Sequence, residues 1–225
     1  MGVLRSETLS RYLDPGSSLG EILFGLIMTL TFTLGAGIII EEEGREGVRM
    51  LLLATVGCNI AWGIIDGALY IVGQVFERGR LLRLGRGIRH TPDAGAAREL
   101  VAGELDDMLE PVSRKDDRSA FYSHIVEQIR SQPAPHRGQV TRDDLLGALV
   151  CFWLVFFASV PAAVPFLFFD DPWTALRISN GVLLFLLFFA GYSWAKYTVA
   201  NPWIAGISFL VGGLMMVLVA IALGG

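Results

Sequence analysis

Apolar residues fall in long unbroken blocks along this chain, and not at the regular short spacing of a soluble core. The five longest blocks cover residues 19–40, 48–75, 145–169, 173–196 and 201–224. A helix needs roughly 20 apolar residues to cross a membrane, because each residue rises about 1.5 Å and the hydrocarbon layer is about 30 Å thick. The pattern therefore predicts an all-α membrane protein with five transmembrane helices.

The polar segment between the second and third blocks predicts a helical insert outside the membrane. We divide the chain into three parts. Residues 1–76 contain a lead-in and the first two transmembrane helices, residues 77–144 form the insert, and residues 145–225 contain the last three transmembrane helices. The insert opens with arginines that we expect to continue the second helix and to contact lipid headgroups: Arg78, Arg80, Arg83, Arg86 and Arg89.

Capping patterns predict where the next helices begin. Thr91 followed by Pro92 is typical of an N-cap with proline at the first helical position, and that helix should run to about Glu110. Ser113 opens a second insert helix that ends before Pro133, and Thr141 with Asp144 opens the third span.

The distribution of positive charge predicts the orientation in the membrane. Of the 18 Lys and Arg residues, 12 lie between Arg78 and Arg142, and none follows Lys196. Membrane proteins keep such residues in cytoplasmic loops, so we expect the insert and the N-terminus in the cytoplasm and the C-terminus outside. The excess of Arg over Lys is typical of a GC-rich bacterial genome, which favours a bacterial inner (plasma) membrane.

Composition narrows the function classes. The chain is 53% hydrophobic with a mean hydropathy of +0.53, beyond the range of an ordinary soluble domain. Its two cysteines, Cys58 and Cys151, lie in spans and exclude a disulfide framework. No Ser-His-Asp set, Gly-rich phosphate loop or HExxH motif occurs, so we expect no enzyme, no tightly bound cofactor and no nucleic-acid partner.

Two carboxylates inside predicted spans, Glu21 and Asp66, are the strongest functional candidates, because charge in a membrane is costly. Asn59 precedes Asp66 by seven residues and so shares its helix face. Met28 could offer a thioether to a soft cation. The alternative is structural: Asn and Asp can bind neighbouring helices together, and Glu21 can sit at the headgroup level.

Small residues form a stripe on the first span, at Gly25, Thr29, Thr33 and Gly37. A four-residue repeat of small residues lets two helix backbones approach closely. The partner could be the same helix of a second copy, giving a homodimer, or another helix of the same chain.

Acidic residues gather on one side of the first insert helix, at Glu99, Asp106, Asp107 and Glu110, with Glu104 on the flank. The opposite side is apolar, with Val101, Leu105, Met108 and Leu109. The acidic side is either a solvated helix face or a cluster that collects divalent cations through hard oxygen ligands.

The layout resembles the vacuolar iron transporter family. The resemblance covers nearly the whole chain in topology, and locally it rests on an acid followed by small residues in the first two spans and on paired prolines in the third. These stretches are Glu21-Ile22-Leu23-Phe24-Gly25, Asp66-Gly67-Ala68-Leu69-Tyr70 and Val160-Pro161 to Pro165-Phe166. The family has five spans with a cytoplasmic metal-binding insert between the second and third.

The resemblance implies a homodimer that exports Fe²⁺ or Mn²⁺ from the cytoplasm in exchange for protons, along the first two spans. Glu21 and Asp66 would stand where the family has its first-span and second-span acids. Two features depart from the family: Trp62 lies near the place of a second-span Met, and the insert lacks a clear Glu-x-x-Glu repeat. These departures favour the alternatives of a non-transporting membrane scaffold or a metal sensor.

Overall fold

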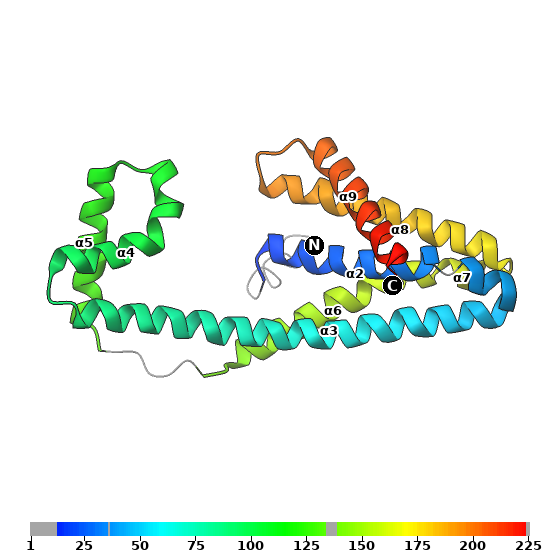
Figure 1. Ribbon diagram of the computed structural model, residues 1–225, viewed down its shortest axis with the longest axis horizontal. Helices are drawn as coiled ribbons and strands as arrows, with labels where there is room; N and C mark the ends of the chain where they lie inside the picture. Colours follow the sequence, from blue (N-terminus) through cyan, green and yellow to red (C-terminus); the bar gives the residue numbers. More distant parts are fainter. Residues whose placement is uncertain (1–12, 36, 134–138, 224–225) are drawn as a thin grey trace, which may run out of the picture. The chain divides into compact units, whose positions relative to one another are not determined.

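Helices make up the regular structure of the parts of the chain that the computed structural model describes, residues 13–35, 37–133 and 139–223 (Figure 1). In order they are α2 Pro15–Gly35, α3 Gly37–His90, α4 Ala94–Leu109, α5 Lys115–Ser131, α6 Arg142–Ala163, α7 Pro165–Phe168, α8 Pro172–Trp194 and α9 Pro202–Ala222, with short 3₁₀ turns at Glu110–Val112 and Ala195–Tyr197. Within those ranges five helical segments are long and apolar enough to cross a membrane. The all-α prediction with five spans is confirmed, and the chain is an integral membrane protein.

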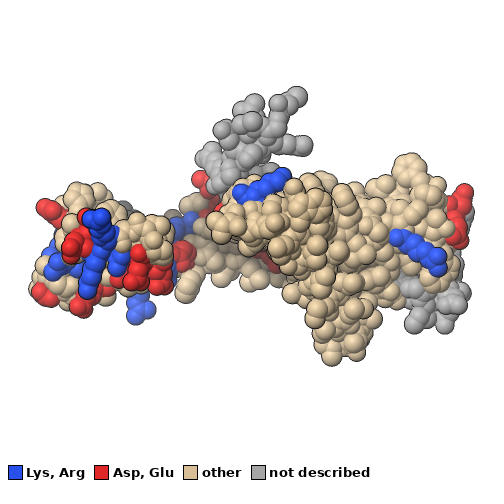
Figure 2. Space-filling view, turned by 90° about the horizontal axis from the view of Figure 1, so that it is seen from above, with Lys and Arg blue, Asp and Glu red and all other residues tan. Residues whose placement is uncertain are grey.

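The chain divides into two compact units. The membrane unit comprises Met1–Ile71 and Thr141–Gly225, and the insert unit comprises Val72–Val140. On the face seen in Figure 2, Lys, Arg, Asp and Glu gather over the insert unit, whereas a broad surface of the membrane unit is uncharged. An uncharged surface is what contact with lipid tails requires.

One of the two span ends that involve glycine or proline differs from its prediction. The first span ends at Gly35 and not near residue 40, because Gly37 already begins α3. The third span runs from Arg142 to Phe168, close to the predicted 145–169. A break at its prolines is also present: α6 contains Pro161 and ends at Ala163, since Pro165 has no N–H to continue the helix and starts the short α7.

Helix α3 continues without interruption through the arginine-rich segment to His90, as the sequence predicts. The cap that follows was predicted wrongly. Thr91 belongs to the end of α3, where its hydroxyl donates to the Gly87 carbonyl, and Asp93 is the N-cap of α4, accepting a hydrogen bond from the Ala96 amide. The capping box of Thr141 and Asp144 is present at the start of α6.

The membrane unit has a core to which four helices contribute. Leu26 and Leu30 of α2 pack with small residues of α6, Leu183 and Leu187 of α8, and Val217 of α9. Glycine permits the close approach of α8 and α9, because a Cβ at Gly191 would lie 2.7 Å from the Ala205 carbonyl oxygen. This packing fixes α2, which carries Glu21.

The insert unit has a small core of its own. Ile88 of α3, Val101 of α4, and Tyr122 and Val126 of α5 are buried together. Three of the four residues predicted for the apolar side of α4 contribute to it. Met108 does not: its side chain is 66% exposed.

Candidate metal-ion site in the membrane unit

Glu21 of α2 and Asp66 of α3 lie together, although 45 residues separate them in the chain. Their carboxyl groups lie close enough to interact directly, and both residues are partly buried. Two carboxyl groups can share a hydrogen bond only if one of them holds a proton. A pair in such contact can therefore hold one shared proton and one negative charge.

The carboxyl pair has no counter-ion from the protein among the described residues. The ion pairs found there join other residues, and neither Glu21 nor Asp66 contacts an Arg or Lys. The Oδ2 atom of Asp66 is also buried without a hydrogen-bond partner in that part of the chain. Negative charge that the protein does not neutralise can be neutralised by a proton or a metal cation.

Helix α6 packs against α2 and α3 beside the pair, at positions where both helices have glycine. A Cβ at Gly25 would lie 2.7 Å from Ala158 Cβ, and one at Gly67 would lie 2.9 Å from the Ala148 carbonyl oxygen. Larger residues would push α6 away. The glycines thus keep three helices in contact around the two acids.

Cys151 of α6 is a neighbour of the pair that the sequence analysis did not select. Its side chain is fully buried, and it is near enough to Glu21 and Asp66 to interact electrostatically with both. A signal was available: Gly147, Cys151 and Val155 recur every four residues, as on a helix face that packs closely against another helix.

Asn59 is also in the site region, fully buried on α3. Its side-chain amide donates a 2.9 Å hydrogen bond to the hydroxyl of Thr29 on α2, which in turn donates to the Gly25 carbonyl oxygen at 2.8 Å. Met28 follows Glu21 by seven residues and so lies on the same side of α2, two turns farther along, where it is partly buried.

The stripe of small residues on α2 has partners within the same chain. Gly25 faces α6, Thr29 binds Asn59 of α3, and Thr33 is 1% exposed. Gly37, the fourth predicted member, begins α3 and is not part of α2. The intramolecular alternative is therefore the one that the structure shows for Gly25 and Thr29.

The acidic residues of the insert are held in a different way from the pair. Glu104 binds Arg80 at 2.6 Å, and Asp106 accepts a hydrogen bond from Tyr122 at 2.7 Å and pairs with Arg118 at 3.1 Å. Burial, together with the adjacent Asp106 carboxylate, raises the pKa of Tyr122. Glu99, Asp107 and Glu110 are exposed, and within the described ranges no three metal-ligating side chains come together.

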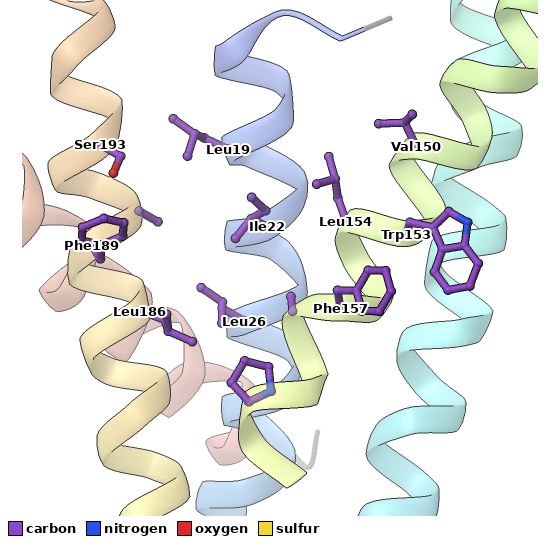
Figure 3. Close-up of a pocket in the computed structure, with 13 residues that line it drawn as sticks. Leu19, Ile22, Leu26, Val150, Trp153, Leu154, Phe157, Leu186, Phe189 and Ser193 are labelled. Atoms are coloured by element: carbon purple, nitrogen blue, oxygen red, sulfur yellow. The ribbon is translucent and has the colours of Figure 1, made fainter. Parts of the chain in front are cut away.

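A separate cavity of about 460 Å³ lies between α2, α6 and α8 (Figure 3). It is lined by Leu19, Ile22, Trp153, Phe157 and Phe189, with Ser193 as a polar residue at its edge. An apolar lining offers no ligands to a cation. The cavity is consequently not a candidate for the metal site.

Comparison with known proteins gives one family. Residues 96–225, more than half of the chain, match the model of the VIT family. No curated protein matches the chain. The matched range begins in α4 and includes α6, α8 and α9, whereas Glu21, Asn59 and Asp66 precede it.

Proposed function

Because the chain belongs to the VIT family, whose members move metal ions such as iron and manganese across membranes, we propose that Glu21 and Asp66 form its cation-exchange site. The observation that carries this proposal is the meeting of two partly buried acids from different helices without a basic partner among the described residues. The cargo we propose is Fe²⁺ or Mn²⁺, for which carboxylate oxygens are suitable ligands.

Charge balance explains how the pair would couple metal to protons. Two adjacent carboxylates repel each other, so an empty pair retains a proton. A divalent cation that is bound by both carboxylates neutralises them and displaces the shared proton. When the cation leaves, repulsion returns and a proton is taken up again. The pair thus alternates between proton and metal, which is the step that a proton antiporter requires.

We further propose that the direction is export from the cytoplasm, with the insert in the cytoplasm. Glu99, Asp107 and Glu110 are the exposed acids of the insert that could attract cations from solution, and Glu104 and Asp106 could join them if their pairs with Arg80 and Arg118 opened. A homodimer is part of the proposal. Its interface would use surfaces other than Gly25 and Thr29, which are covered within the subunit.

Reconstituted protein tests the proposal. In proteoliposomes with an interior metal dye, the wild type should take up Mn²⁺, Fe²⁺ or Co²⁺, while Asp66→Asn should be slower by about tenfold or more, since loss of one charge from a desolvated contact costs on the order of 2–5 kcal/mol. Glu21→Gln should behave in the same way. Asp117→Asn, on the exposed surface of α5, is the matched control.

Equal uptake by Asp66→Asn and Asp117→Asn would contradict the proposed role of the pair. Tight Mn²⁺ binding by wild-type protein without any flux would instead favour the metal-sensor alternative.

A further inference from the structure

Polar side chains continue along the contact between α2 and α3 beyond the carboxyl pair. Glu21 meets Asp66 and Thr29 meets Asn59, which fixes an antiparallel register for the two helices. In that register the next turn brings Thr33 of α2 to the level of Thr55 of α3. At about 1.5 Å per residue, Asn59 lies roughly 10 Å and Thr55 roughly 16 Å from Asp66 along α3.

Two oxygen atoms at these levels are buried without a hydrogen-bond partner in the described part of the chain: Asn59 Oδ1 and Thr55 Oγ1. The residues are only 1% and 3% exposed. Buried polar groups in proteins are nearly always paired, so an unpaired one indicates a missing water or ion. Here two of them lie one helical turn apart on the same face of α3.

The orientation of the Asn59 amide is determined by its neighbour. Thr29 already donates its hydroxyl proton to the Gly25 carbonyl, so it can only accept from Asn59. The Asn59 NH₂ group must therefore face Thr29, and the carbonyl oxygen is left free. Thr55 also differs from the threonines of α2, because Thr29, Thr31 and Thr33 all donate to carbonyls of their own helix.

We propose that Asn59 and Thr55 form a second, uncharged binding station for the transported divalent cation, with Thr29 as the residue that positions Asn59. This inference rests on the proposed function. Neutral carbonyl and hydroxyl oxygens are hard ligands that accept such ions. They bind more weakly than carboxylates, and a weak site after a strong one lets an ion leave the path.

Substitutions that remove only these oxygens test the station in full-length protein. Asn59→Leu and Thr55→Val should each slow Mn²⁺ uptake into proteoliposomes about tenfold or more, the size expected for one lost interaction with a charged group. Mn²⁺ binding at the carboxyl pair should stay unchanged in Thr55→Val, which leaves the hydrogen bond between Asn59 and Thr29 in place. Thr55→Ser retains the hydroxyl and should restore uptake that Thr55→Val loses. Thr31→Val, which removes a hydroxyl that is already satisfied within α2, is the matched control.

A variant that gains metal binding distinguishes a binding role of Asn59 from a purely structural one, because a structural role would not change the number of bound ions. Asn59→Asp places a carboxylate at the station, so detergent-solubilised protein should bind one additional Mn²⁺ per subunit in a titration followed by electron paramagnetic resonance. An unchanged stoichiometry would overturn the station, as would uptake by Asn59→Leu and Thr55→Val at the rate of Thr31→Val.

The station and the carboxyl pair can fail separately. If Asp66→Asn is inactive and Thr55→Val transports like Thr31→Val, the station is refuted and the pair stands. If Asp66→Asn is active and Thr55→Val is slow, the pair is refuted and the station stands.

Discussion

Replacement of Gly25 by alanine tests the packing that holds the carboxyl pair together. The new Cβ would lie 2.7 Å from Ala158 Cβ and 2.9 Å from the Val155 carbonyl oxygen, whereas ordinary contacts are 3.4–4 Å. Because a backbone oxygen cannot rotate away, α6 would have to move. Overpacking of this kind costs about 1–3 kcal/mol.

Gly20→Ala is the matched control on the same helix, since a Cβ there would have no atom within 4 Å. Both changes gain the same helix propensity, about 1 kcal/mol, so the difference between the two variants isolates the overpacking. At roughly 2–4 °C per kcal/mol for a chain of this size, Gly25→Ala should melt about 2–12 °C below Gly20→Ala.

The assay is thermal unfolding of the purified protein in detergent, followed by tryptophan fluorescence. Equal melting temperatures for the two variants would refute the close contact between α2 and α6. A large loss for Gly20→Ala would show that α2 has a neighbour at its exposed glycine.

Two further predictions concern the insert unit. Backbone N–H groups of Ala96 and Gly95 hold the pKa of Asp93 below its ordinary value of 3.8. A carboxyl group with a lowered pKa stabilises the folded state at pH values above its pKa in the unfolded chain, so Asp93→Ala should lower the melting temperature at neutral pH. The difference from wild type should shrink as the pH falls below about 3.8, because the carboxyl group is then protonated. A difference that is constant with pH would contradict this. Asp106→Ala should destabilise the insert by about 1 kcal/mol, because it removes one of the partners of the mostly buried Arg118, although the carboxylate itself is partly screened by solvent. Circular dichroism melts should show no such loss for the exposed neighbour Asp107→Ala.

The sequence predicted most of the features that depend on local pattern. Ser113 is an exception: it was predicted to open the second insert helix, but Arg114 is the N-cap of α5. The five spans follow from the length of the apolar blocks, and the capping box follows from the three-residue spacing of Thr141 and Asp144. The extension of α3 was predicted from the arginine-rich segment that directly follows the second apolar block. The error at Thr91 has a local cause. Two capping residues, Thr91 and Asp93, flank Pro92, and which of them starts α4 depends on how far α3 continues before it ends.

Features that depend on a partner helix were harder to predict. A stripe such as Gly25, Thr29 and Thr33 shows that something packs closely, but spacing alone does not identify the partner. The meeting of Glu21 with Asp66, and the position of Cys151 beside them, depend on the register among three helices. That register is fixed by contacts between residues that are distant in sequence, such as the hydrogen bond from Asn59 to Thr29 and the close packing of Ala158 against Gly25.

The most direct test of the central claim is to locate the metal itself. Crystals of the full chain soaked with Mn²⁺ should show an anomalous difference peak within coordination distance of the Glu21 and Asp66 carboxyl oxygens, and the peak should be lost in Asp66→Asn. Mn²⁺ bound elsewhere, with the two carboxyl groups still in contact with each other, would contradict the account.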